Sequence, residues 1–200
     1  MKPSEGLCVC VFSFGKEMEA PLKYKNVIVF DGSSAHNWPV LFLELGLPDL
    51  PDGYRMRIVQ TSFMDSEITV YGDASGAQLS CRPVHDTLGI GKNREVTVTV
   101  QPHFVLLRNQ PRGPTPSSDK RNVLYGLMSA NVPSINSLMS EYCNLERPLM
   151  LGVLREIRDR VGQERFPLNE VTYHSSAACM VISPAMPAVL KLSHAHAGMG

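Results

Sequence analysis

The chain has 200 residues, of which 44% are hydrophobic and 19% are charged. This composition is typical of a folded globular protein and excludes a chain that is disordered throughout. The formal net charge is zero, so no overall field draws the surface toward nucleic acid or an anionic membrane. The length allows one large domain, or one domain and part of another.

Neither the cysteines nor the first residues predict secretion. The five cysteines form no C-x-x-C pair and no zinc-site spacing, which favours reduced cytosolic thiols over a disulfide framework. Residues 7–14 (LCVCVFSF) are apolar, but Glu5 precedes them and Lys16 follows without a small-residue cleavage site. The run is far shorter than the ~20 residues of a membrane-spanning helix. We therefore expect a cytoplasmic protein without a transmembrane segment.

The first third of the chain predicts strands that alternate with a helix. Residues 26–30 (NVIVF) are a mostly apolar run rich in β-branched residues, as in a strand buried on both faces of a parallel sheet. A turn cluster follows, and residues 39–45 (PVLFLEL) predict a helix with Pro39 in its first turn. Residues 55–61 (RMRIVQT) predict a second strand.

Two further strands and a loop are predicted in the middle of the chain. In residues 95–100 (EVTVTV) valines alternate with threonines, which predicts a half-buried strand in a hairpin or an edge ribbon. Residues 104–107 (FVLL) predict a fully apolar strand. Residues 109–120 (NQPRGPTPSSDK) contain three prolines and a glycine, so we expect an exposed, mobile loop there.

The last third predicts two helices and a strand. The first helix is indicated by four apolar residues at helical spacing: Val123, Leu124, Leu127 and Met128. A second helix begins near Pro148 and ends near Gly162, with an apolar stripe opposite charged residues. Residues 188–192 (AVLKL) predict a strand. Strands alternating with helices indicate an α/β protein, and we place a domain boundary near residues 131–137.

The segment most suited to chemistry is residues 190–200 (LKLSHAHAGMG). Small residues let the backbone approach an anion, successive amides can cradle a phosphate, and Lys191 is placed to reach that phosphate. The segment is neither a Walker A loop nor a dinucleotide fingerprint, so spacing leaves a phosphate loop and a plain glycine turn both open. His194 and His196 suit a metal or a polar loop, and with too few partners for a metal we predict no metal site.

Several motifs occur in the same order in one known family. Residues 191–200 (KLSHAHAGMG) closely match the nucleotide loop of synapsins, and residues 133–138 (PSINSL) resemble a second specific motif of that family. Weaker matches in the same order are residues 27–31, 60–65, 105–108, 166–168 and 172–173. The chain therefore resembles a synapsin over residues 22–200.

The resemblance implies an α/β fold with two parts. Residues 22–135 are expected to form a Rossmann-like pre-ATP-grasp domain, and residues 136–200 the beginning of an ATP-grasp domain. Residues 1–21 match no part of the family and are expected to be a divergent N-terminal segment. Because the chain stops inside the loop at Gly200, we expect an incomplete ATP-grasp domain and a fragment of a longer protein.

The resemblance also implies a nucleotide site. Lys191 corresponds to the strand lysine that contacts ATP, and residues 198–200 to the flexible loop over the phosphates. Arg147 stands where synapsins carry a second nucleotide-contacting lysine, although a planar guanidinium differs in geometry from an ammonium group. Without the family, Arg147 is equally a solvent-exposed residue at a helix start. The candidate nucleotide-binding residues are Lys191, Arg147, His196, Gly198, Met199 and Gly200.

The implied function is regulatory and not enzymatic. Synapsins bind ATP with Mg²⁺ or Ca²⁺, form homodimers, and associate with actin and the synaptic vesicle surface to regulate transmitter release. The expected location is therefore the presynaptic cytoplasm, peripheral on vesicles, with no nucleic-acid partner. ATP is expected to bind a complete protein, and to bind weakly or not at all to a chain that ends at Gly200.

Two alternatives stay open at this stage. One is a fragment of an ATP-grasp ligase, which would join a carboxylate to an amine through an acyl phosphate. The sequence contains no identifiable magnesium carboxylate cluster or acceptor site, which disfavours catalysis by these residues. The other is a remnant that folds its first domain and binds no nucleotide.

Overall fold

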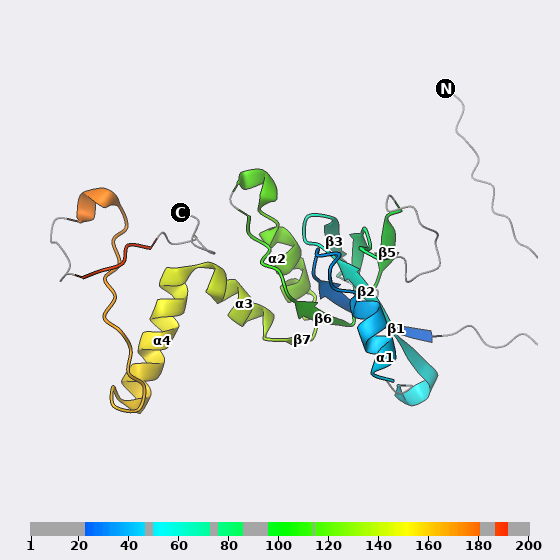
Figure 1. Cartoon of the computed structure of the whole chain (residues 1–200), viewed down its shortest axis with the longest axis horizontal. Coiled ribbons are helices and arrows are strands. Elements are labelled where there is room, and N and C mark those ends of the chain that lie inside the picture. Colours follow the sequence, from blue (N-terminus) through cyan, green and yellow to red (C-terminus); the bar gives the residue numbers. More distant parts are fainter. Residues whose placement is uncertain are drawn as a thin grey trace, which may run out of the picture.

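The computed structural model describes residues 23–46, 50–72, 76–85, 96–113, 115–180 and 187–191. Two β-sheets lie within them, a parallel sheet in the order β2-β1-β6-β7 and an antiparallel sheet in the order β3-β4-β5 (Figure 1). The parallel strands are β1 (Lys23–Phe30), β2 (Tyr54–Thr61), β6 (Phe104–Leu107) and β7 (Ser134–Ile135). The antiparallel strands are β3 (Ser66–Val70), β4 (Ala77–Cys81) and β5 (Val98–Val100).

Helices surround the sheets and continue beyond them. The α-helices are α1 (Trp38–Glu44), α2 (Arg121–Ser129), α3 (Leu138–Leu145) and α4 (Arg147–Val161). Short 3-10 turns occur at η1 (Pro51–Gly53), η2 (Pro116–Ser118) and η3 (Ala177–Cys179). None of the helices in the described ranges is long and apolar enough to cross a bilayer.

Strand β1 is the central, doubly buried strand that its sequence predicts. Val27 and Val29 face α1, whereas Ile28 and Phe30 face the antiparallel sheet and α2. All four side chains are buried because the strand has neighbours on both edges and cover on both faces. A continuous apolar run is therefore stable here, whereas a half-exposed strand would need alternating polar residues.

The layer over one face of the parallel sheet is α1. Its N-cap, Asn37, accepts a hydrogen bond from the Val40 amide at 3.2 Å, and Pro39 occupies the first turn. Trp38 and Phe42 pack against the valines of β1. The helix predicted at residues 39–45 and the strands predicted at residues 55–61 and 104–107 are confirmed.

The layer over the other face consists of α2 and the antiparallel sheet. Val123, Leu124 and Leu127 of α2 are buried, which confirms the helix predicted from their spacing. Gly126 permits the close approach of α2 to β3: a Cβ at this position would lie only 2.2 Å from Cγ2 of Ile68. The absence of a side chain therefore sets how deeply this helix packs.

The alternation predicted for residues 95–100 is present over a shorter strand. In β5, Val98 and Val100 are buried while Thr99 is exposed, and the strand pairs with β4 at the edge of the antiparallel sheet. Glu95 lies outside the described residues. Strands β3, β4 and β7 and helix α3 were not predicted, since their short sequences carry too few apolar positions to define a period.

The loop at residues 109–120 is less exposed than its composition predicts. Pro111 is buried. Among the described residues of the loop, only Asn109, Gln110 and residues 115–117 are exposed. The Lys120 amide donates to the Pro111 carbonyl at 2.7 Å, and Arg112 forms a β-bridge with Asp119. Internal hydrogen bonds thus close the loop on itself. The predicted loop is therefore present, but it is only partly exposed.

The prediction of a strand at residues 188–192 is wrong for residues 188–191, which the structure describes. Residues 188–191 carry no strand, and Leu192 lies outside the described residues. Val189 is 80% exposed and Leu190 is 77% exposed. A strand needs a hydrogen-bonded neighbour, and no described strand pairs with this segment.

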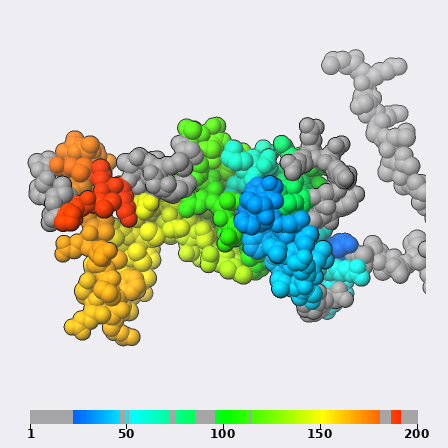
Figure 2. Space-filling view, in the orientation of Figure 1, coloured from blue at the N-terminus to red at the C-terminus, as the bar shows by residue number. Residues whose placement is uncertain are grey.

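Helix α4 and the segment after it project from the rest of the described chain, as Figures 1 and 2 show in yellow and orange. We call residues 147–180 the projecting region and described residues 23–145 the core region. The helix predicted from Pro148 to Gly162 is confirmed, and Gly162 ends it with a φ of 90° that suits glycine. No residue of α4 is buried. The predicted apolar stripe is thus present on the helix and is only partly covered by described residues.

Candidate functional site

The first turn of α4 carries Arg147, one of the two described candidates for nucleotide contact. Glu146 is the N-cap, and its carbonyl oxygen accepts from the Leu149 amide at 2.9 Å and the Met150 amide at 3.2 Å. Pro148 has no N–H to offer. The amides of Leu149 and Met150 are therefore engaged within the helix, so a side chain such as that of Arg147 would supply the main attraction for an anion here.

The Glu146 carboxylate links α4 to the core region. Oε1 of Glu146 accepts from Nη1 of Arg112 and, at 3.0 Å, from Nη1 of Arg121. Arg121 also donates to Asp119, with Nη2 at 2.7 Å from Oδ2. The hydrogen bond from Arg121 is the main cause that holds the pKa of Asp119 below its usual value, against the effect of burial. Both carboxylates therefore accept hydrogen bonds from guanidinium groups.

The charge cluster beside the start of α4 joins two guanidinium groups (Arg112 and Arg121) to two carboxylates (Asp119 and Glu146). Arg147 follows Glu146 in the chain and brings a further guanidinium group to the first turn of α4. Arginine suits phosphate because its planar fork can donate two hydrogen bonds. Sequence analysis missed this cluster, because Glu146 lies 25 residues from Arg121 and 34 from Arg112.

Lys191 lies at the end of the described chain. It is exposed in a segment without secondary structure. His196, Gly198, Met199 and Gly200 lie outside the described residues, so their predicted role stays a prediction.

The described part of the chain contains no evident set of ligands for a divalent cation. Among those residues, no group of three or more His, Cys, Asp or Glu side chains could hold a metal ion. The carboxylates of Asp119 and Glu146 are engaged by guanidinium groups. The described residues therefore supply no cluster of ligands for the counter-ion of a phosphate.

Comparison with known proteins gives matches along both parts of the chain. Residues 20–134 match the family described as "Synapsin pre-ATP-grasp domain", and residues 136–200 match "Synapsin, ATP binding domain". A curated relative named Synapsin, from Drosophila melanogaster, is 32% identical over 177 residues, which cover 88% of this chain and 16% of the relative. The chain therefore spans less than a fifth of that relative's length.

The fold and these matches agree on the class of protein. A parallel sheet covered by helices, followed by a segment that matches an ATP-binding domain, defines an α/β protein with a pre-ATP-grasp part and an ATP-grasp part. The predicted fold class is confirmed. The chain belongs to the synapsin family, as its motifs indicate. The exact boundaries predicted at residues 21, 135 and 136 stay predictions.

Proposed function

We propose that this chain is the ATP-binding part of a synapsin-like regulatory protein that associates with synaptic vesicles and acts in transmitter release. The observation that carries the proposal is the match of residues 136–200 to the synapsin ATP binding domain. Within this segment, Arg147 begins α4 next to Glu146, which binds Arg112 and Arg121. Arg147, Lys191, His196 and residues 198–200 would contact ATP, with Mg²⁺ or Ca²⁺ as its counter-ion.

The proposed role of the residues is binding and not catalysis. ATP supplies phosphate charge, which the Arg147 guanidinium and the Lys191 ammonium would offset. Glu146 orients the start of α4 through its bonds to Arg112 and Arg121, and so places Arg147 at a fixed distance from the core region. Nucleotide binding would then depend on a contact between both matched parts of the chain.

Calorimetric titration with ATP, in the presence of Mg²⁺ or Ca²⁺, tests nucleotide binding to the chain and to a version extended through the rest of the ATP-grasp domain. We expect the extended version to bind. Within it, Lys191→Ala should weaken binding about tenfold and Arg147→Ala should weaken it less, since Lys191 lies in the motif that matches the family more closely. Arg160→Ala is the matched control, because its side chain is 75% exposed at the other end of α4. Absence of binding by the extended version would contradict the proposal and favour a remnant that binds no nucleotide.

The vesicle role requires a separate experiment. A fluorescent fusion of the chain, expressed in cultured neurons, should concentrate at presynaptic terminals with a vesicle marker, whereas the fluorescent protein alone should not. Sedimentation of the purified chain tests the proposed homodimer, and co-sedimentation with filaments tests actin. Diffuse fluorescence throughout the cytoplasm would contradict vesicle association.

A further inference from the structure

The carboxyl ends of β1 and β6 form a topological switch point. The sheet order is β2-β1-β6-β7, so the connection through α1 leaves β1 toward one edge and the connection through α2 leaves β6 toward the other. The helices α1 and α2 cover opposite faces of the sheet. In open parallel sheets, ligands bind in the crevice at such a point, where neighbouring loops turn away from each other.

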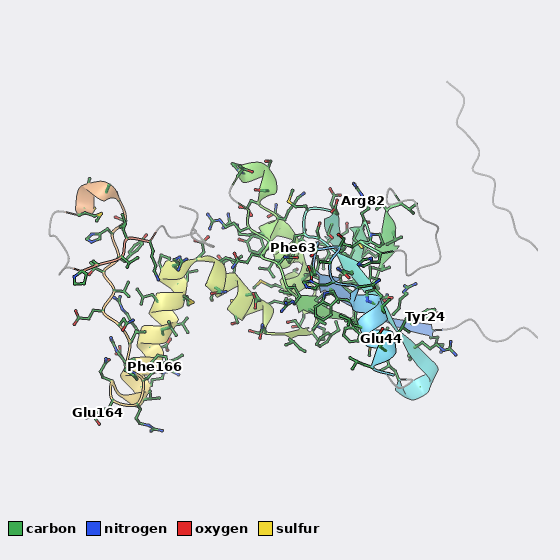
Figure 3. The ribbon with its side chains drawn as sticks, in the orientation of Figure 1. Tyr24, Glu44, Phe63, Arg82, Glu164 and Phe166 are labelled. Carbon is green, nitrogen blue, oxygen red and sulfur yellow. The ribbon has the colours of Figure 1, made fainter. Side chains whose placement is uncertain are left out.

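A cleft of about 280 Å³ lies at this point, between the loops that follow β1, β2 and β6. Its described lining consists of Gly32, Ser33, Ser62, Phe63, Met64, Asn109, Gln110, Pro111, Gly113 and Ser118. Phe63, labelled in Figure 3, is 4% exposed and stacks on Phe30 with ring centroids 4.1 Å apart. The aromatic wall of the cleft is therefore anchored in the core.

Hydrogen bonds and close packing hold the cleft's loops in place. The Gly32 amide donates to Oδ1 of Asn109 at 2.8 Å, which ties the loop after β1 to the loop after β6. A Cβ on Gly32 would lie 2.9 Å from Cβ of Ser62, so glycine allows the loop after β2 to approach as well. The buried Gln60 donates to the carbonyl of Ser33 at 3.0 Å. The cleft is thus formed before any ligand arrives.

The polar groups of the cleft are neutral donors. Oδ1 of Asn109 is engaged, but its Nδ2 has no hydrogen bond to another described residue, and neither has the Gln110 amide. The Ser33 hydroxyl accepts from the Ala35 amide and retains its own proton for donation. Apolar surface from Phe63 and neighbouring side chains adjoins these groups.

No charged side chain is among the described residues that line the cleft. A charged ligand would lose hydration here without gaining an ion pair, and that cost favours an uncharged ligand. We propose that this cleft binds a small, uncharged organic molecule that carries a carbonyl or hydroxyl oxygen beside an apolar group. The oxygen would accept from Asn109 Nδ2 and Gln110, and the apolar group would lie against Phe63.

This site is distinct from the candidate nucleotide residues, which lie at the start of α4 and at residues 191–200. The proposal therefore stands independently of ATP binding and can be tested without nucleotide. It also differs in ligand chemistry, because the residues near α4 are charged and those of the cleft are neutral.

Titration of the ¹⁵N-labelled chain, followed by amide chemical shifts, tests the cleft. The neutral probes are butanamide, N-acetylalaninamide and N-acetylleucinamide, and their charged counterparts are butanoate, N-acetylalanine and N-acetylleucine. We expect at least one neutral probe to shift the amides of Gly32 and Ser33 and the side-chain amides of Asn109 and Gln110. Its affinity should exceed that of its anionic counterpart by about tenfold, owing to the desolvation of the carboxylate.

Two variants separate binding from folding. Asn109→Asp keeps an oxygen that can accept from the Gly32 amide and removes the free Nδ2 donor, so binding should weaken about tenfold while the spectrum stays folded. Gln110→Ala should weaken it less, and Gln78→Ala, at an exposed position on β4, should not change it. The proposal is overturned if no neutral probe shifts the cleft amides, if the anions bind as well, or if folded Asn109→Asp binds like the unmodified chain.

Discussion

The core region and the projecting region both carry apolar side chains, but they bury them to very different extents. In the core region, Ile28, Phe30 and Leu124 are fully buried between a sheet and its neighbours. In the projecting region, Leu149 and Val153 of α4 are 47% and 45% exposed. Both regions contain apolar periodicity, so periodicity predicts an element without predicting what covers it. The stability of the two regions should therefore respond differently to matched substitutions.

The largest difference is expected for leucine truncation. Leu124→Ala should lower the free energy of unfolding by about 2–5 kcal/mol, because it opens a cavity at a residue with 0% exposure. Leu149→Ala should lower it by no more than about 1 kcal/mol, because half of that side chain already faces solvent. Urea denaturation followed by circular dichroism measures both. Equal losses would show that α4 is buried against something beyond the described residues.

The next largest effect on stability is expected for Asp31, a buried carboxylate in the core region. Burial of Asp31 would raise its pKa, but hydrogen bonds from Trp38 Nε1 at 2.8 Å, the Ser33 amide and His36 outweigh it, so the pKa is lowered. The folded state then binds fewer protons than the unfolded state, so this stabilisation is complete above the ordinary pKa and lost as the pH falls through the lowered one. Asp31→Asn should cost about 1.5–3 kcal/mol at neutral pH and flatten the acid limb of stability against pH.

The measurement for Asp31 is urea denaturation at a series of pH values from neutral to acid. An acid limb that is equally steep in Asp31→Asn would contradict the assignment. Tryptophan fluorescence gives a second readout, since Trp38 is the single tryptophan of the chain and donates to this carboxylate.

Replacement of two helical glycines by alanine should change the free energy of unfolding in opposite directions. Gly126→Ala should cost about 1–3 kcal/mol, because the new Cβ would lie 2.2 Å from Cγ2 of Ile68 and force α2 away from β3. Gly152→Ala in α4 should stabilise by about 0.5–1 kcal/mol, because nothing lies within 4 Å and alanine is the better helix former. Thermal denaturation of both variants is the check. Destabilisation by Gly152→Ala would place a close neighbour at α4.

The sequence predicts the parallel sheet well because each of its long strands is determined locally. Residues 27–30 and 104–107 are apolar throughout, and the burial of Val27–Phe30 in β1 and of Val105 in β6 follows from that pattern. The strand predicted at residues 188–192 is also mostly apolar and fails over residues 188–191, because a strand also requires a partner. A local pattern therefore fixes the preference of a segment, and pairing decides whether it is realised.

The candidate sites were predicted less completely for a related reason. Lys191 and Arg147 were found through motifs, which are local in sequence. The bonds from Glu146 to Arg112 and Arg121 and the bond from Gly32 to Asn109 join residues 25 to 77 positions apart, and no local pattern indicates them. Loop composition was also misleading at residues 109–120, where hydrogen bonds replace the exposure that prolines and serines predict.

The smallest expected effect on stability lies at the contact between the two regions. Arg112, Arg121 and Glu146 have side chains that are 21–27% exposed, so Glu146→Gln should cost about 0.2–1 kcal/mol, and less at high salt. Its effect on proteolysis should be clearer, because Arg112 lies in the loop at residues 109–120 and Glu146 holds it to α4. Limited proteolysis with mass mapping should show faster cleavage within residues 109–120 in Glu146→Gln than in the unmodified chain. Glu156→Gln, which disturbs only an exposed pair with Arg160 inside α4, should leave that cleavage rate unchanged. Equal rates in all three proteins would mean that the loop is held by its own hydrogen bonds, and that the link to α4 does not constrain it.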